Sequence, residues 1–395
     1  KYDFISHKLK MRIIHYIDSI KAGNLLSDQL LRLTSAQEEY ADVKTITQQG
    51  DFKKLLADFQ PDIVHIHSCW QYHIATYANW AAKKHCAVVF SPHWELNERA
   101  RTTEQGMRKK VKTLLYQAKM VQSTDALLVS SEHEKQEILS LGWTKRIDIV
   151  RDSVLNSTLT DDEMAQQTIT FYRKVLDTRY QFVMTAMEKD AIPSLLYVGL
   201  TEESVHNLLP SDQLLNLRSL NPEQWRRVLL YADDEGVREI VDSAISRLQL
   251  NAPAIDTAAI RRFPLLRPKE TTPVGTDKLI GNLPMTRQRL DDYTSKEDAI
   301  FKQIATIIAN TRQIERKKRL SLRLLTDLYK VIKYNDYDED RLAEVLRHLR
   351  LYRYSCRIIQ LLAEKTLLKE GFMPFPPRND RKTKGMIRNN FEQRH

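Results

Sequence analysis

Residues 61–90 read PDIVHIHSCWQYHIATYANWAAKKHCAVVF and contain the pattern that decides the fold. Two short apolar runs, at 63–66 and 87–90, have the composition of buried β-strands. Between them, residues 72–84 have the apolar spacing of a helix, and the Pro61-Asp62 pair marks the start of the first strand. A strand, a helix and a second strand in this order predict a parallel βαβ unit.

The same alternation continues on both sides of this unit. We expect strands at 11–17, 126–129 and 147–150, and helices at 25–33, 52–59, 104–122 and 132–141. Strands that alternate with helices form an open, doubly wound sheet, and ligands gather at the carboxyl ends of its strands. The sequence therefore predicts an α/β protein with an N-terminal, doubly wound, Rossmann-like domain over residues 11–155.

The rest of the chain has a less regular pattern. Residues 156–190 predict a helical connector. Residues 191–252 predict a divergent second α/β unit, with strands at 195–198 and 228–231 and a helix at 236–248. We interpret residues 253–294 as a linker, residues 295–372 as a helical C-terminal region and residues 373–395 as a basic, disordered tail.

Composition excludes several classes of protein. The 395 residues carry a net charge of +10, which favours anionic partners without selecting one. The three cysteines are widely spaced and form no CxxC pair, so neither a disulfide framework nor a metal site is indicated. No dinucleotide or phosphate-loop fingerprint appears, so no cofactor is expected. No apolar run reaches the length of a membrane span, which favours the cytoplasm, either free or peripherally at the inner face of the membrane.

Four segments, taken in order, resemble the family 4-like glycosyltransferases, which have the GT-B fold. They are MRIIHYIDSIKAGNLLSDQLLRL at 11–33, PDIVHIHSCW at 61–70, FSPHWEL at 90–96 and STDALLVSSEHEKQEILSLGW at 123–143. The resemblance covers about residues 11–155 and implies that this domain lies on the acceptor side of the enzyme. It also implies retaining transfer of a sugar from a nucleotide sugar to a glycan or lipid-linked acceptor in cell-surface polysaccharide assembly.

Two turns of the predicted domain supply candidate substrate-binding residues. Gly23 and Asn24 precede a helix, whose free N–H groups either receive an anion or belong to an ordinary turn. His65 and His67 are expected to point to different faces of the sheet, so that one of them packs and His67 faces the cleft. Trp70 belongs to the loop after this strand, which we expect to line the same cleft.

The segment FSPHWEL carries the candidate catalytic residue, His93. The resemblance implies that this histidine touches the transferred sugar or the diphosphate, and a neutral imidazole can donate a hydrogen bond to such oxygens. Relatives have a small residue where this chain has Trp94, whose ring either stacks on a sugar or fills the cleft. Glu95 completes the substrate-binding candidates of this loop.

The donor side departs from the family pattern. Residues 197–203 read YVGLTEE, where the resemblance implies cations for a diphosphate, and no two glutamates stand eight positions apart. Arg226 and Arg227 remain as candidates for donor binding. Two hypotheses therefore stand: an active glycosyltransferase with a divergent donor site, or a catalytically inactive scaffold that binds a protein partner through its C-terminal helices.

Two basic segments allow further partners. Residues 107–121 predict a basic amphipathic helix that either packs its apolar face on the sheet or touches an anionic membrane. The C-terminal helices carry many arginines, which allow nucleic-acid binding. Solvated helix faces explain those arginines better, and we do not expect nucleic acid as a partner.

Overall fold

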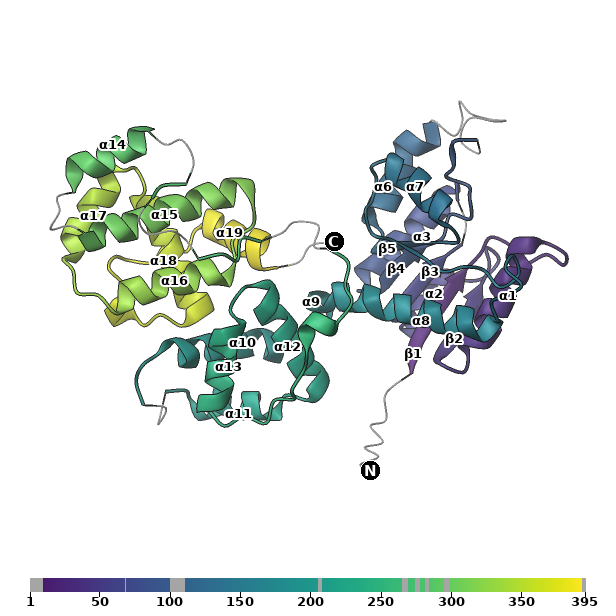
Figure 1. Cartoon of the computed structure of the whole chain (residues 1–395), viewed down its shortest axis with the longest axis horizontal. Helices are drawn as coiled ribbons and strands as arrows, with labels where there is room; N and C mark the ends of the chain where they lie inside the picture. The colour runs from purple at the N-terminus through teal and green to yellow at the C-terminus, as the bar shows by residue number, and fades with distance from the viewer. Residues whose placement is uncertain are drawn as a thin grey trace. The chain divides into compact units, whose positions relative to one another are not determined.

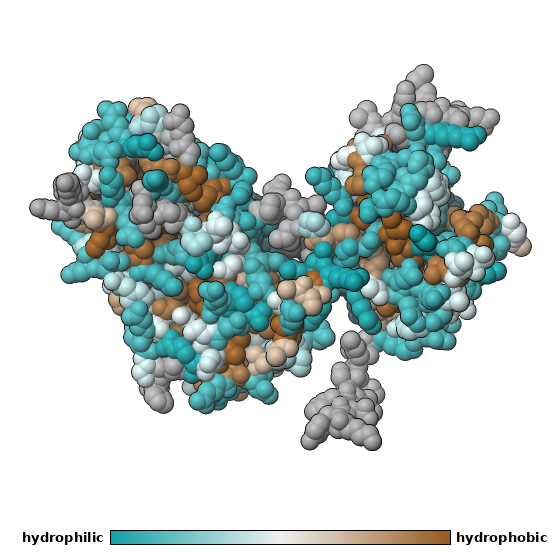
Figure 2. Space-filling model, viewed as in Figure 1, coloured by the Kyte–Doolittle hydropathy of each residue, from teal (hydrophilic) through white to brown (hydrophobic). Residues whose placement is uncertain are grey.

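The chain forms two compact units, each of which is described by itself (Figure 1). Unit 1 comprises residues 1–180, 260–264 and 395, and unit 2 comprises residues 181–259 and 265–394. The computed structural model describes residues 10–67, 69–99, 111–204, 208–264, 269–273, 278–280, 284–294 and 299–392. Figure 2 shows hydrophilic residues over most of the visible surface of each unit. Within the described residues, no helix has both the length and the apolar character needed to cross a membrane.

Unit 1 is built on a six-stranded parallel sheet with the order β2-β1-β3-β4-β5-β6. The order changes direction between β1 and β3, and folds of this kind bind ligands in the crevice at such a switch point. The predicted α/β class with a Rossmann-type, open parallel sheet is confirmed. The strands are β1 Met11–Tyr16, β2 Ala41–Ile46, β3 Ile63–Ile66, β4 Ala87–Phe90, β5 Ala126–Val129 and β6 Ile147–Ile149.

Helices cover both faces of this sheet (Figure 1). Because side chains alternate along a strand, neighbouring residues of β1, β3 and β4 supply two separate cores. Ile14, Val64 and Val88 share one core with α3, whereas Ile13, Ile63 and Val89 share the other with α8. In the part of unit 1 that the structure describes, the helices include α1 Leu25–Gln37, α2 Phe52–Phe59, α3 Tyr72–Lys83, α6 Ala118–Ser123, α7 Glu132–Ser140 and α8 Asp161–Thr178.

Two parts of unit 1 differ from the prediction. Strand β2 was not predicted, because it is an edge strand in which only Ala41 and Ile46 are buried, so it has no apolar run. The helix expected at 104–122 begins outside the described residues. Its described part contains a π-helical turn at Thr113–Gln117 and then α6, and Val111 and Leu115 are exposed instead of packed on the sheet.

The described residues of unit 2 form helices, and their one β-bridge joins Lys269 to Arg319. The strands expected at 195–198 and 228–231 are therefore wrong, as is the second α/β unit expected over 191–252. The helices are α9 Tyr180–Val183, which begins in unit 1, and α10 Ala186–Leu200, α11 Ser211–Ser219, α12 Pro222–Asp234, α13 Arg238–Arg247, α14 Pro284–Tyr293, α15 Ala299–Lys317, α16 Leu322–Lys333, α17 Glu339–His348, α18 Tyr352–Thr366 and α19 Arg381–Phe391, with 3-10 turns at Thr257–Ala259 and Glu370–Phe372.

Helix α10 explains why its sequence looks like a strand. It lies at the centre of unit 2 and packs against α11, α12, α13, α16 and α18, so its apolar residues are buried on all sides. Gly199 lets α10 approach α13 closely, because a Cβ at this position would collide with the Ile240 carbonyl. A helix buried all round has a continuous apolar run, which periodicity alone does not distinguish from a buried strand.

The prediction that residues 373–395 are a disordered tail is also wrong for the described part of this segment, because α19 is a packed helix. Asp380 caps α19 with its side chain and pairs with Arg357 at 2.8 Å. Met386 and Phe391 are buried, and the buried Asn390 accepts a hydrogen bond from the Leu320 backbone at 2.8 Å. The high charge of the segment belongs to the exposed face of this helix.

The segment interpreted as a linker is partly structured. Residues 260–264 join unit 1, where Phe263 is buried against Phe171 and Lys174. In unit 2, α14 forms a helix within the expected linker, and other parts of that segment lie outside the described residues.

Candidate functional site

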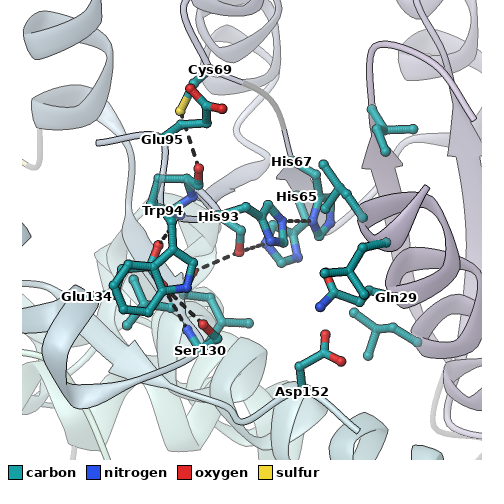
Figure 3. A pocket seen from close by; sticks show the side chains of 18 of the residues that line it. Gln29, His65, His67, Cys69, His93, Trp94, Glu95, Ser130, Glu134 and Asp152 are labelled. Atoms are coloured by element: carbon teal, nitrogen blue, oxygen red, sulfur yellow. Dashed lines mark hydrogen bonds between the residues drawn. The ribbon is translucent and has the colours of Figure 1, made fainter. Parts of the chain in front are cut away.

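A pocket of about 670 Å³ lies in unit 1 at the carboxyl ends of the parallel strands. The loops after β1, β3, β4, β5 and β6 line it, together with the start of α1. Figure 3 shows His65, His67 and His93 at its centre, Trp94 and Glu134 on one side, and Gln29 and Asp152 on the other. The lining includes the predicted residues Asn24, His67, Trp70, His93, Trp94 and Glu95.

The central histidines form hydrogen-bonded contacts with one another. His93 Nε2 lies 3.0 Å from His67 Nδ1, and His67 Nε2 lies 2.9 Å from His15 Nδ1. His65 makes separate contacts to Tyr172 Oη at 2.6 Å and to Ser91 Oγ at 2.8 Å. His15, His65 and His67 are buried, whereas His93 is only half-buried.

The expectation that His65 and His67 point to different faces is wrong. Residues two positions apart along a strand share a face, and the two imidazole rings lie 3.9 Å apart, centre to centre. His15 and His65 are register partners on the adjacent strands β1 and β3, which brings a third ring to the same face. His15 was not predicted as a site residue, although its position one residue before the end of β1, next to the crevice, was a usable signal.

Burial keeps these histidines neutral. It lowers the pKa of His15 and the pKa of His93 to about 4 in each case. Burial also holds the pKa values of His65 and His67 well below the ordinary value, and the neighbouring imidazoles lower them further. At neutral pH the pocket therefore presents uncharged imidazoles.

The loop after β4 holds His93 and Trp94 in left-handed backbone conformations, with φ values of 46° and 66°. The Trp94 N–H donates to Glu134 Oε1 at 2.7 Å, which ties this loop to the first turn of α7. Trp70, in the loop after β3, also has a positive φ of 64°, and its indole N–H donates to the Glu95 carbonyl at 3.1 Å. Glu95 thus serves the loop with its backbone, and its side chain is exposed.

The turn after β1 has the geometry of a helix cap. Gly23 has a left-handed φ of 71°, which suits a glycine, and it is not part of the pocket lining. Asn24 lines the pocket, but its side-chain oxygen already accepts a hydrogen bond from the Ser27 backbone at 3.1 Å. This capping supports the interpretation as an ordinary turn.

Glu134 and Asp152 are pocket residues that the sequence analysis missed. Burial raises the pKa of each, while hydrogen bonds from neighbouring backbone groups oppose the rise. Asp152 lies in the loop after β6, three residues past its last residue, so its position beyond a strand end could have identified it. Gln37 and Tyr172, which contact the histidines from α1 and α8, had no comparable signal because they lie far away in the sequence.

The donor-binding candidates belong to unit 2, whereas every lining residue of the pocket belongs to unit 1. Arg227 donates to the buried carboxylate of Glu188 at 2.7 Å, which is a structural ion pair inside unit 2. Arg226 also has an interaction partner.

The three buried histidines could in principle hold a metal ion, since one nitrogen of each lies within 4.8 Å of the others. No metal site was predicted at these positions. However, both ring nitrogens of His15, His65 and His67 have hydrogen-bond partners within the protein. The geometry is therefore explained without a metal.

Residues 41–154 match the family model of Glycosyltransferase Family 4. The match confirms the resemblance of the N-terminal segment and supports a glycosyltransferase-like function, with binding of a nucleotide sugar and an acceptor in general terms. No curated protein and no solved structure matches the chain significantly.

Proposed function

We propose that this chain is a glycosyltransferase-like protein of cell-surface polysaccharide assembly, whose unit 1 binds the glycan or lipid-linked acceptor. The observation that carries this proposal is the pocket at the carboxyl ends of β1, β3 and β4. The loops after β3, β4 and β5 that line it lie within residues 41–154, the segment that matches the family, whereas β1 and the start of α1 precede that segment. Sugar would then be transferred from a nucleotide sugar to an acceptor hydroxyl, with His93 as the polar group nearest to that hydroxyl.

The charges of the pocket favour a neutral, hydroxyl-rich ligand. Among the described lining residues, the only lysine or arginine is Lys21, whereas four carboxylates line the pocket: Asp18, Glu95, Glu134 and Asp152. A diphosphate needs charge-assisted partners to offset its desolvation, and carboxylates repel it. Neutral imidazoles and a tryptophan ring suit sugar hydroxyls and sugar faces instead.

A panel of neutral and anionic oligosaccharides tests this proposal by equilibrium binding to the full chain. We expect a neutral glycan to bind and His93→Ala to weaken its binding at least about tenfold, the equivalent of about 1.4 kcal/mol. His348→Ala, which removes an exposed histidine of unit 2, serves as the control and leaves binding unchanged. A chain that binds none of the glycans, or binds them equally well without His93, contradicts the proposal.

The second candidate is a catalytically inactive scaffold that binds a protein partner through its C-terminal helices. The helical character of the described residues of unit 2 favours it. The Arg227–Glu188 ion pair favours it too, because Arg227, a candidate for binding the nucleotide sugar, is already paired with a carboxylate. Calorimetric titration with UDP-, GDP- and ADP-sugars at low salt separates the two candidates. Micromolar binding that is lost in Arg226→Ala supports the enzyme, while absence of heat with every donor supports the scaffold.

We also propose a cytoplasmic location with peripheral contact at an anionic membrane. Val111 and Leu115 are exposed, Leu115 by 68%, and the basic residue Lys119 follows on the same helical segment. We expect the chain to float with vesicles that contain phosphatidylglycerol, and Leu115→Glu to abolish flotation. Leu215→Glu, at an equally exposed leucine of unit 2, is the control. Flotation that persists in Leu115→Glu would refute this contact.

A further inference from the structure

A chain of buried hydrogen bonds begins at a backbone carbonyl and fixes its own direction. The Leu128 carbonyl can only accept, and the Ser91 hydroxyl donates to it at 2.8 Å. The single Ser91 proton is thereby used, so His65 Nε2, 2.8 Å away, must donate to Ser91 Oγ. A neutral His65 then has an unprotonated Nδ1, which accepts from the Tyr172 hydroxyl at 2.6 Å.

These contacts end at Tyr172, whose proton points to His65. A second row of contacts begins at the Gln37 side chain. Gln37 Nε2 is buried and has no hydrogen-bond partner among the described residues, whereas Gln37 Oε1 faces His15.

The remaining links are three imidazoles. Gln37 Oε1 lies 2.8 Å from His15 Nε2 and can only accept, so His15 carries its proton on Nε2. His15 Nδ1 then accepts from His67 Nε2, and His67 Nδ1 accepts from His93 Nε2. Each neutral ring has one N–H donor and one acceptor nitrogen. The direction of hydrogen-bond donation is therefore the same at every link between His93 and Gln37.

We propose that the polar chain Gln37–His15–His67–His93 holds His93 as its Nε2–H tautomer and leaves the Nδ1 lone pair to accept a ligand hydroxyl. Gln37, His15 and His67 are then positioning residues for His93. His93 is the half-buried end of the polar chain, and within the described residues no hydrogen bond involves its Nδ1. The tautomer assignment stands on this geometry, and only the identity of the ligand rests on the proposed function.

The assignment has a consequence for specificity. A hydroxyl group can donate to the Nδ1 lone pair, whereas an ionised phosphate has only acceptor oxygens and would be repelled by it. His93 would therefore contact an acceptor or donor hydroxyl and not the diphosphate that the family resemblance also allows.

Side-chain nitrogen NMR of the full chain at neutral pH tests the polar chain without any ligand. We expect Nε2–H tautomers at His15, His65, His67 and His93 in the wild type. Gln37→Met removes the acceptor that orients the row, so His15, His67 and His93 should shift to mixed tautomers while His65 keeps its own. Gln37→Glu retains an acceptor and should keep the wild-type tautomer at His93.

Gln29→Met is the matched control, because Gln29 lines the pocket from the same helix but lies outside the polar chain. An Nδ1–H tautomer at His93 in the wild type would overturn the proposal, as would a His93 tautomer that is unchanged in a folded Gln37→Met variant. Stoichiometric zinc binding with shifts at His15, His65 and His67 would also overturn it, because coordination uses the lone pairs that the polar chain requires. The wild-type spectrum decides the tautomer even if Gln37→Met does not fold.

Discussion

Three non-glycine residues beside the pocket, Trp70, His93 and Trp94, have left-handed backbone conformations. Such conformations cost roughly 1–2 kcal/mol for a residue with a Cβ and persist where the surroundings enforce them. Trp94 is held by Glu134, and Trp70 by burial of its indole. The backbone at these turns therefore stores strain that positions the histidine loop.

We expect the two tryptophans to respond differently to replacement by glycine. Trp94→Gly relieves the strained φ at a half-buried side chain, so the free energy of unfolding should change by less than about 1 kcal/mol. Trp70→Gly also removes a side chain that is 6% exposed and should cost about 3 kcal/mol or more. Urea unfolding of both variants checks this pair, and equal losses would show that burial of the Trp70 side chain does not set the two positions apart.

The buried imidazole of His15 predicts a pH dependence of stability. Its pKa is lowered to about 4 in the folded chain, whereas an unfolded histidine titrates near 6.5. Between these values the unfolded state binds the proton, so the stability present above about pH 6.5 is lost as the pH falls toward about 4. The loss attributable to one such histidine is roughly 3 kcal/mol.

Urea unfolding between about pH 7 and about pH 5 measures this slope. His15→Gln should make the free energy of unfolding depend less steeply on pH, because one proton fewer is taken up on unfolding. His348→Gln, at an exposed position, is the control and should leave the slope unchanged. A slope that is identical in His15→Gln and the wild type would contradict a buried, neutral His15.

Among the elements, the parallel strands of unit 1 could be predicted because β3, β4 and β5 are short, apolar runs buried on both faces. Helices α10 and α12 could not be told from strands, because their burial within unit 2 produces apolar runs of the same length. The pocket residues after strand ends were predictable in part, as His67 and His93 show. The helix residues that contact the histidines were not, because α1 and α8 supply Gln37 and Tyr172 from distant parts of the sequence.

Helix α19 is a second element whose role sequence alone did not reveal, and its packing can be tested directly. Phe391 is 7% exposed, so Phe391→Ala should lower the free energy of unfolding by about 3 kcal/mol. Arg388→Ala, at an exposed position of the same helix, should change it by less than about 0.5 kcal/mol. Thermal unfolding of both variants distinguishes a packed helix from a disordered tail, for which the two substitutions would be equally silent.

For the whole molecule, the family match and the pocket both fall in unit 1, whereas the described part of unit 2 is helical. Recognition of an acceptor can therefore be argued from named residues of unit 1, including His93 and Asp152. Unit 2 offers Arg226 and Arg227, of which Arg227 already pairs with Glu188. The function proposed for the chain accordingly rests on the acceptor pocket.

We propose that a glycan hydroxyl binds at His93 Nδ1. The most direct measurement is the side-chain nitrogen spectrum of His93 in the full chain, recorded with and without a saturating amount of the tightest-binding glycan from the panel. We predict that His93 Nδ1 shifts as it accepts a hydrogen bond, while His348 does not change. Saturation with the glycan that leaves His93 Nδ1 unchanged would contradict the claim.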